Sequence, residues 1–122
     1  INQLLNDVLG AIGSIRVETG GWDQANRLLE GAAILVNATS LGMVGQPPLT
    51  LDLSPLPDDA LVYDIITHPH DTDLLKAATR RGLATRDGMH MLIGQAREAF
   101  QLFYGQPAPL DQDGVIREKL LA

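Results

Sequence analysis

The sequence contains no cysteine, which excludes disulfide bonds and thiolate metal sites. It also lacks an apolar run of the roughly 18 to 20 residues that a membrane-spanning helix needs. Its first residues form a polar, amphipathic segment that does not resemble a signal peptide. A chain without cysteines is compatible with a reducing compartment. We therefore expect a cytoplasmic protein with no membrane partner.

Dense basic segments are absent as well. Nine lysines and arginines face 15 aspartates and glutamates, giving a net charge of −6, which argues against a nucleic acid as partner. No serine stands in the context of a nucleophile elbow. His68, His70 and Asp71 lie close in sequence, but no carboxylate cluster at ligand spacing joins them, so we expect no metal site.

The glycine motif G-x-G-x-x-G, which binds the pyrophosphate in dinucleotide-binding folds, does not occur. Gly10 and Gly13 lie at the end of an expected helix, where glycine commonly serves as a cap. The 122 residues, 45% of them hydrophobic, fit one globular domain, whereas a two-domain dehydrogenase needs roughly twice that length. Because the first residue is Ile1, we interpret the sequence as a fragment or a processed chain, or as one whose earlier residues are missing.

Apolar periodicity predicts an alternation of helices and strands. Strands are expected at residues 14–18, 32–38, 61–66 and 83–85, and helices at residues 4–12, 25–31, 72–81, 89–104 and 115–121. Residues 43–57 hold four of the seven prolines and form a loop. Thr72 is the expected N-cap of its helix. This alternation predicts an α/β protein, with helices on both faces of a parallel sheet.

Three sequence segments carry the functional information, and each follows an expected strand. The first is Asn37-Ala-Thr-Ser-Leu-Gly-Met43, which stands where open α/β sheets place their ligands. An ordinary turn with local side-chain to backbone bonds is the alternative for its first four residues. The second spans residues 64–75 and the third residues 87–95, where a glycine opens a long amphipathic helix.

Together these segments resemble the C-terminal, cofactor-binding half of the shikimate dehydrogenase family. The second segment is similar to the family's D-x-x-Y-x-P-x-x-T-x-L-L, and the third to its D-G-x-x-M-L-x-x-Q. All three occur in the family's order and at plausible spacing. The resemblance implies a partial Rossmann-like, doubly wound parallel sheet with flanking helices. It also implies that residues 1–122 are the C-terminal part of a nicotinamide-dinucleotide-binding domain, without the N-terminal substrate domain and the Gly-rich phosphate loop.

The resemblance also implies which residues form the site. Those expected to bind the cofactor are Asn37, Thr39, Ser40, Ile65, Gly88 and Met91, and those expected to bind the substrate are Thr67 and Gln95. Thr67 stands where the family usually has a tyrosine that contacts the substrate. Ile65 is equally consistent with a plain core position. Gln95 lies roughly 90° from the centre of the helix's apolar side; the alternative for it is a solvated glutamine.

The implied activity is the NADP-dependent interconversion of 3-dehydroshikimate and shikimate in aromatic amino acid biosynthesis. NAD remains possible, because the residues that select the cofactor would lie upstream of Ile1. The family's catalytic lysine and aspartate belong to the substrate domain, and Lys76 and Lys119 stand in other segments, so we expect no catalytic residue and no turnover from the isolated chain. A quinate/shikimate dehydrogenase relative and a non-catalytic interaction module are the alternatives. Homodimerisation or association with the missing N-terminal segment is the expected assembly.

Overall fold

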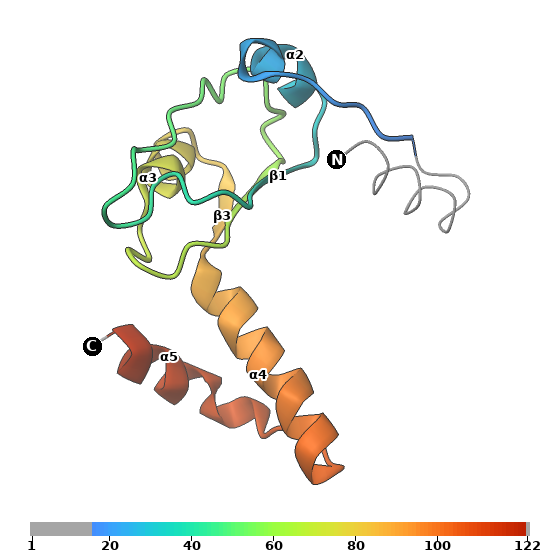
Figure 1. The fold of residues 1–122 in the computed structure, drawn as a ribbon, viewed down its shortest axis with the longest axis vertical. Coiled ribbons are helices and arrows are strands. Elements are labelled where there is room, and N and C mark those ends of the chain that lie inside the picture. The colour runs from blue at the N-terminus through green and yellow to red at the C-terminus, as the bar shows by residue number, and fades with distance from the viewer. Residues whose placement is uncertain (1–15, 122) are drawn as a thin grey trace.

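A three-stranded parallel sheet is the centre of the computed structural model, which describes residues 16–121 (Figure 1). Its strands are β1 (Ile34–Asn37), β2 (Leu61–Asp64) and β3 (Ala84–Arg86), in the order β1-β2-β3. Because all three run in one direction, they end at one edge, which we call the carboxyl edge. The predicted α/β class, parallel sheet and flanking helices are confirmed.

The helical elements follow the expected pattern with small shifts. They are η1 (Trp22–Gln24), α2 (Ala25–Leu29), α3 (Asp73–Arg80), α4 (Gly88–Tyr104), η2 (Leu110–Gln112) and α5 (Asp113–Leu121). Thr72 is the N-cap of α3, where its side chain accepts a hydrogen bond from the backbone N–H of Leu75, as the sequence predicted. The left-handed Gly105, with φ +68°, ends α4. The helix expected at residues 4–12 lies outside the described residues.

One predicted strand is wrong in its described part. Residues 16–18, the second half of the strand expected at 14–18, belong to neither a strand nor a helix. Alternation of apolar residues makes a strand only where a neighbouring strand supplies hydrogen bonds, and the Val17 side chain is 41% exposed. Glu18 instead pairs with Arg27, with 2.6 Å between the carboxylate and the guanidinium.

The core lies between the sheet and α3. Val62 of β2 and Leu74 of α3, both at most 2% exposed, belong to this core. The loop at residues 43–57 contributes three of the buried side chains, those of Leu49, Leu53 and Leu56. On the other face of the sheet, Ile34 and Val36 of β1 remain about half exposed. Burial is therefore concentrated on the α3 side.

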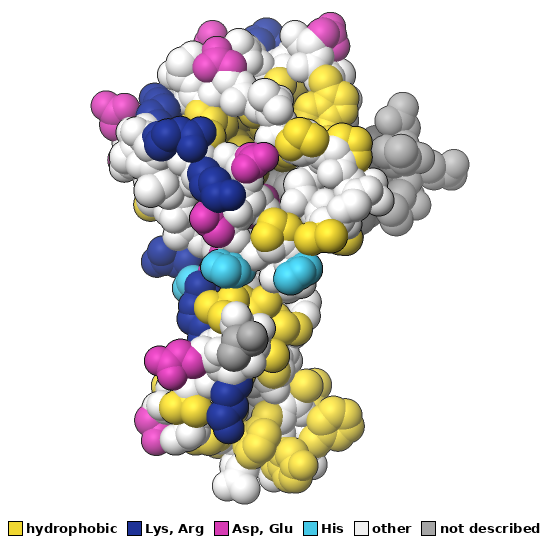
Figure 2. Space-filling view, turned by 90° about the vertical axis from the view of Figure 1, so that its left-hand side faces the viewer, with side chains coloured by type: hydrophobic (Ala, Val, Ile, Leu, Met, Phe, Trp, Pro, Cys, Tyr) yellow, Lys and Arg dark blue, Asp and Glu magenta, His cyan; other side chains and the backbone are white. Residues whose placement is uncertain are grey.

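Helices α4 and α5 form a hairpin that extends away from the carboxyl edge, with α5 running back alongside α4 (Figure 1). An ion pair between Arg97 and Asp113 joins the two helices. The predicted apolar side of α4 is only partly buried: Met89 is 4% exposed, but Phe103 is 84% exposed. Hydrophobic side chains gather at the far end of the hairpin (Figure 2). None of the helices between residues 16 and 121 is both long and apolar enough to span a membrane.

Candidate functional site

Backbone hydrogen bonds bring three of the predicted site segments together at the carboxyl edge. The N–H of Ile65 donates to the carbonyl of Asn37 over 3.2 Å. The N–H of Gly88 donates to the carbonyl of Ile66, also over 3.2 Å. The turn after β1, the exit of β2 and the start of α4 therefore lie side by side. This is the edge at which parallel α/β sheets bind ligands.

Gly88 is required here by close packing. A Cβ atom at this position would lie closer than 3.0 Å to the carbonyl oxygens of both Ile65 and Ile66. Those atoms are backbone and cannot rotate away, so only glycine allows α4 to begin against the exit of β2. The resemblance had placed a glycine here for its approach to the cofactor, and the structure adds a packing reason.

The side chain of Asn37 is 3% exposed and makes every hydrogen bond that an amide can make. Its Nδ2 donates to the carbonyl of Leu41 and to Oδ1 of Asp64, each over 3.1 Å. Its Oδ1 accepts from the backbone N–H of Thr39 over 3.1 Å and from the Thr39 hydroxyl over 2.7 Å. Local bonds of this kind are what we expected if residues 37–40 form an ordinary turn. The Asn37 amide thus shapes the turn from inside the protein.

The other predicted residues differ in how accessible they are. Thr39 and Ser40 are exposed, although the Thr39 hydroxyl also accepts a hydrogen bond from the N–H of Leu41 over 3.1 Å. Ile65 and Thr67 follow β2 and are half-buried. The carboxyl edge therefore presents hydroxyl groups next to an apolar side chain.

Met91 and Gln95 lie on α4, beyond Gly88. Met91 is half-buried, one helical turn along, and Gln95 is exposed. Seven residues at 1.5 Å each place Gln95 roughly 10 Å from Gly88 along the helix axis. The structure therefore gathers Asn37, Thr39, Ile65 and Gly88 at one place and leaves Gln95 on the adjoining helix.

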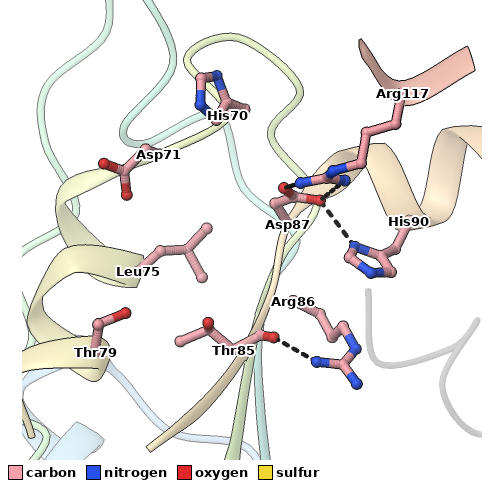
Figure 3. Close-up of a pocket in the computed structure, with 9 residues that line it drawn as sticks. All are labelled: His70, Asp71, Leu75, Thr79, Thr85, Arg86, Asp87, His90 and Arg117. Carbon is pink, nitrogen blue, oxygen red and sulfur yellow. Dashed lines mark hydrogen bonds and ion pairs between the residues drawn. The ribbon is translucent and has the colours of Figure 1, made fainter. Parts of the chain in front are cut away.

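Sequence reasoning missed a cluster of charged residues around Asp87. The Asp87 carboxylate accepts two hydrogen bonds from the Arg117 guanidinium and is 2.9 Å from Nδ1 of His90 (Figure 3). Arg117 lies on α5, so this ion pair joins α5 to the start of α4. Beside it is a cavity of about 300 Å³, which His70 and Arg86 also border. The sequence signal for this cluster was Asp87 itself, an aspartate directly before the first residue of α4. Nothing near it in the sequence indicated that Arg117 is its partner.

Burial opposes ionisation of Asp87, but the hydrogen bonds from Arg117 and His90 and their positive charge outweigh it. The pKa of Asp87 is therefore held well below its usual range. A lowered pKa in the folded state stabilises the protein above the unfolded-state pKa of about 4, and this stabilisation is lost as the pH falls towards the folded-state pKa.

Replacing Asp87 by asparagine should therefore weaken the protein most near neutral pH. We expect Asp87→Asn to lower the free energy of unfolding by about 1–2 kcal/mol at neutral pH, and by much less at about pH 2. Urea denaturation at both pH values measures this difference. The exposed Asp59 provides the control, because Asp59→Asn removes a charge without removing an ion pair. An equal loss at both pH values would contradict the role given to the carboxylate.

The fold defines the class: a Rossmann-like α/β domain with the site segments gathered at its carboxyl edge. No model of a protein family matches the chain. Shikimate dehydrogenase (NADP+) from Sphingopyxis alaskensis is 63% identical over 89 residues, which are 73% of this chain and 32% of that protein. The chain belongs to the shikimate dehydrogenase family. It spans about a third of the length of the curated relatives it matches.

Solved structures agree with this assignment. Quinate dehydrogenase from Corynebacterium glutamicum in complex with NAD has a TM-score of 0.78 and 37% identity, covering 91% of this chain and 40% of that one. Shikimate 5-dehydrogenase from Listeria monocytogenes in complex with shikimate and NAD has a TM-score of 0.69 and 27% identity, covering 78% of this chain and 34% of that one. The resemblance first noted in three short segments thus extends over most of the described fold.

Proposed function

We propose that this chain is the C-terminal, nicotinamide-side part of an NADP-dependent oxidoreductase that interconverts 3-dehydroshikimate and shikimate. Two backbone hydrogen bonds carry the proposal, because they gather the site segments at the carboxyl edge: the N–H of Ile65 donates to the carbonyl of Asn37, and the N–H of Gly88 donates to the carbonyl of Ile66. The name of the 63% identical relative supports NADP as the cofactor. In this proposal residues 1–122 form part of a nicotinamide-dinucleotide-binding domain.

The residues at the carboxyl edge fit a nicotinamide ribose. The exposed Ser40 can donate to the sugar or accept from it, whereas the Thr39 hydroxyl, which donates to Asn37, can only accept. The half-buried Ile65 offers an apolar surface to a flat ring. The backbone at Gly88 faces the nicotinamide amide, and Met91 extends the apolar surface along α4. The bound cofactor supplies the hydride, and these residues orient its ring and exclude water.

The substrate in this proposal is a shikimate-type ring acid. Thr67 lies after β2 and offers a hydroxyl group to the substrate. The exposed Gln95 on α4 offers an amide that can bond a ring hydroxyl. The chain positions one side of the substrate only. Proton transfer is assigned to the lysine and aspartate of the family's substrate domain.

Nuclear magnetic resonance of the ¹⁵N-labelled chain tests the site directly. We expect nicotinamide mononucleotide and NADP+ to shift the amide signals of Thr39, Ser40, Ile65 and Gly88. Adenosine monophosphate is the matched control, because it carries a nucleotide phosphate and ribose without the nicotinamide ring. Equal shifts from both mononucleotides, or shifts confined to residues away from the carboxyl edge, would contradict the proposal.

The isolated 122-residue chain should not turn over its substrate. Orientation without a proton donor and acceptor leaves the hydride step uncatalysed, and general acid–base groups typically contribute about 10² to 10⁴-fold. We expect no reduction of NADP+ above background when shikimate is added, measured as the absorbance of the reduced nicotinamide. Shikimate oxidation by the chain alone would overturn the assignment of catalysis to another part of the protein.

A preference for quinate is the second candidate, and it rests on a specific similarity. The quinate dehydrogenase structure has a TM-score of 0.78 and 37% identity to this chain. Thr67 also replaces the tyrosine that the family usually places beside its substrate. Parallel titrations with shikimate and quinate, in the presence of NADP+, separate the two: the preferred ring acid gives the larger shifts at Thr67 and Gln95.

The exposed apolar side chains at the far end of the α4–α5 hairpin support the alternative of an interaction module. Leu102 and Phe103 are each 84% exposed and Tyr104 is 67% exposed, which favours association through this surface. In this reading the chain either dimerises or binds the N-terminal segment of its own polypeptide. Size-exclusion chromatography with and without cofactor distinguishes the readings, because a stable module does not change its behaviour when NADP+ is added.

A further inference from the structure

A fully buried carboxylate lies at the centre of the carboxyl edge. Asp64 ends β2 and is 0% exposed. Its Oδ1 accepts hydrogen bonds from Nδ2 of Asn37 and from the backbone N–H of Ile66, each over 3.1 Å. Its Oδ2 accepts from the hydroxyl of Thr72 over 2.7 Å. Three donors from three segments therefore converge on one side chain.

Each partner continues into a different part of the site. Asn37 holds the turn that carries Thr39, through the bonds described above. Thr72 accepts from the N–H of Leu75 over 3.3 Å and so caps α3. Ile66 links Asp64 to the start of α4, because the carbonyl of Ile66 accepts from the N–H of Gly88. One carboxylate thus links the turn after β1, the exit of β2 and the starts of both α3 and α4.

We propose that Asp64 is the positioning residue of this site: it holds Thr39, Ile65 and Gly88 in the relative arrangement that receives the nicotinamide. The inference rests on the proposed function for the identity of the ligand, but not for the arrangement itself. A buried carboxylate carries a desolvation cost that an apolar side chain would avoid. The two oxygen atoms of the carboxylate only accept hydrogen bonds, so each of the three donors is directed to a defined oxygen atom.

Two substitutions separate positioning from general stability. Asp64→Leu keeps the branched shape of the side chain but removes both acceptor oxygens, so all three donors lose their partner. Thr72→Val removes the hydroxyl that donates to Asp64 and accepts from Leu75, and it leaves Asn37 and Ile66 bonded to Asp64. Thr72→Val is therefore the matched control for loss of the buried hydrogen bonds at the start of α3 alone.

Amide hydrogen exchange gives the first readout. At denaturant concentrations that give the two variants equal global stability, the amides of Thr39, Ile66 and Gly88 should exchange on the order of tenfold faster in Asp64→Leu than in Thr72→Val. Equal rates at these three amides would overturn the proposal.

Ligand binding gives the second readout. The dissociation constant for nicotinamide mononucleotide should rise about tenfold in Asp64→Leu and stay within about twofold of wild type in Thr72→Val. An unchanged constant in Asp64→Leu would show that Asp64 does not position the ligand site. Failure of the wild-type chain to bind the mononucleotide counts against the proposed function, and the exchange rates then still decide whether Asp64 sets the arrangement.

A measurement on the wild-type chain covers the case in which Asp64→Leu does not fold. If one carboxylate holds these segments together, the amides of Thr39, Ile66 and Gly88 should open as one unit. Their exchange rates should then give a common opening free energy and a common dependence on denaturant. Separate opening energies for the three amides would overturn the proposal.

Discussion

Gly88→Ala should lower the free energy of unfolding by about 3 kcal/mol, the upper end of what overpacking usually costs. The added Cβ would overlap the carbonyl oxygens of Ile65 and Ile66, which are backbone atoms that cannot adopt another rotamer. To remove the overlap, α4 would have to move away from the exit of β2. The hydrogen bond from Gly88 to Ile66 would then be strained or lost, and with it the geometry of the carboxyl edge.

Gly94 offers a matched control on the same helix. A Cβ at position 94 would meet nothing within 4 Å, and alanine is a better helix former than glycine by about 1 kcal/mol. We expect Gly94→Ala to stabilise the protein slightly, so the two identical substitutions should have opposite signs. Urea denaturation followed by circular dichroism measures both. A similar effect at the two positions would mean that α4 does not begin tightly against β2.

Leu74→Ala is the second large effect that we expect. Leu74 lies in the first turn of α3, is 2% exposed and packs in the core beside Val62. Truncating a buried leucine removes its transfer free energy and leaves a cavity, which together cost about 2–5 kcal/mol. Because the loss affects the contact between α3 and the sheet, it should also loosen the capped start of the helix at Thr72.

Leu102→Ala, the same substitution on an exposed residue, is the control. The Leu102 side chain is 84% exposed on α4, so its removal should change the free energy of unfolding by no more than about 0.5 kcal/mol. Both variants can be compared by their midpoints of urea denaturation. A large loss at Leu102 would show that the hairpin end is covered in solution, which would support the interaction reading.

Local signals in the sequence were sufficient for most of the elements. The start of α3 was predicted from Thr72 as N-cap, and the structure contains that cap. The end of α4 was predicted at residue 104, where the structure ends the helix against the left-handed Gly105. These signals work because capping and glycine conformation depend on residues within one turn of the chain.

Signals that need a distant partner were less reliable. The alternation at residues 14–18 predicted a strand, but residues 16–18 form no strand and remain outside the sheet. The third segment predicted an amphipathic helix, but α4 leaves Phe103 on its apolar side 84% exposed. A periodic pattern states which face of an element is apolar, and not whether another element covers it.

The sequence alone determined the class of the fold, the order of its helices and strands, and the family, because periodicity, caps and short motifs are local properties of the chain. Only the tertiary structure decided which side chains meet. Asp64 bonds Asn37 across 27 residues, and Asp87 pairs with Arg117 across 30. Such contacts depend on how strands and helices pack in space, and that packing brings the carboxyl ends of parallel strands together.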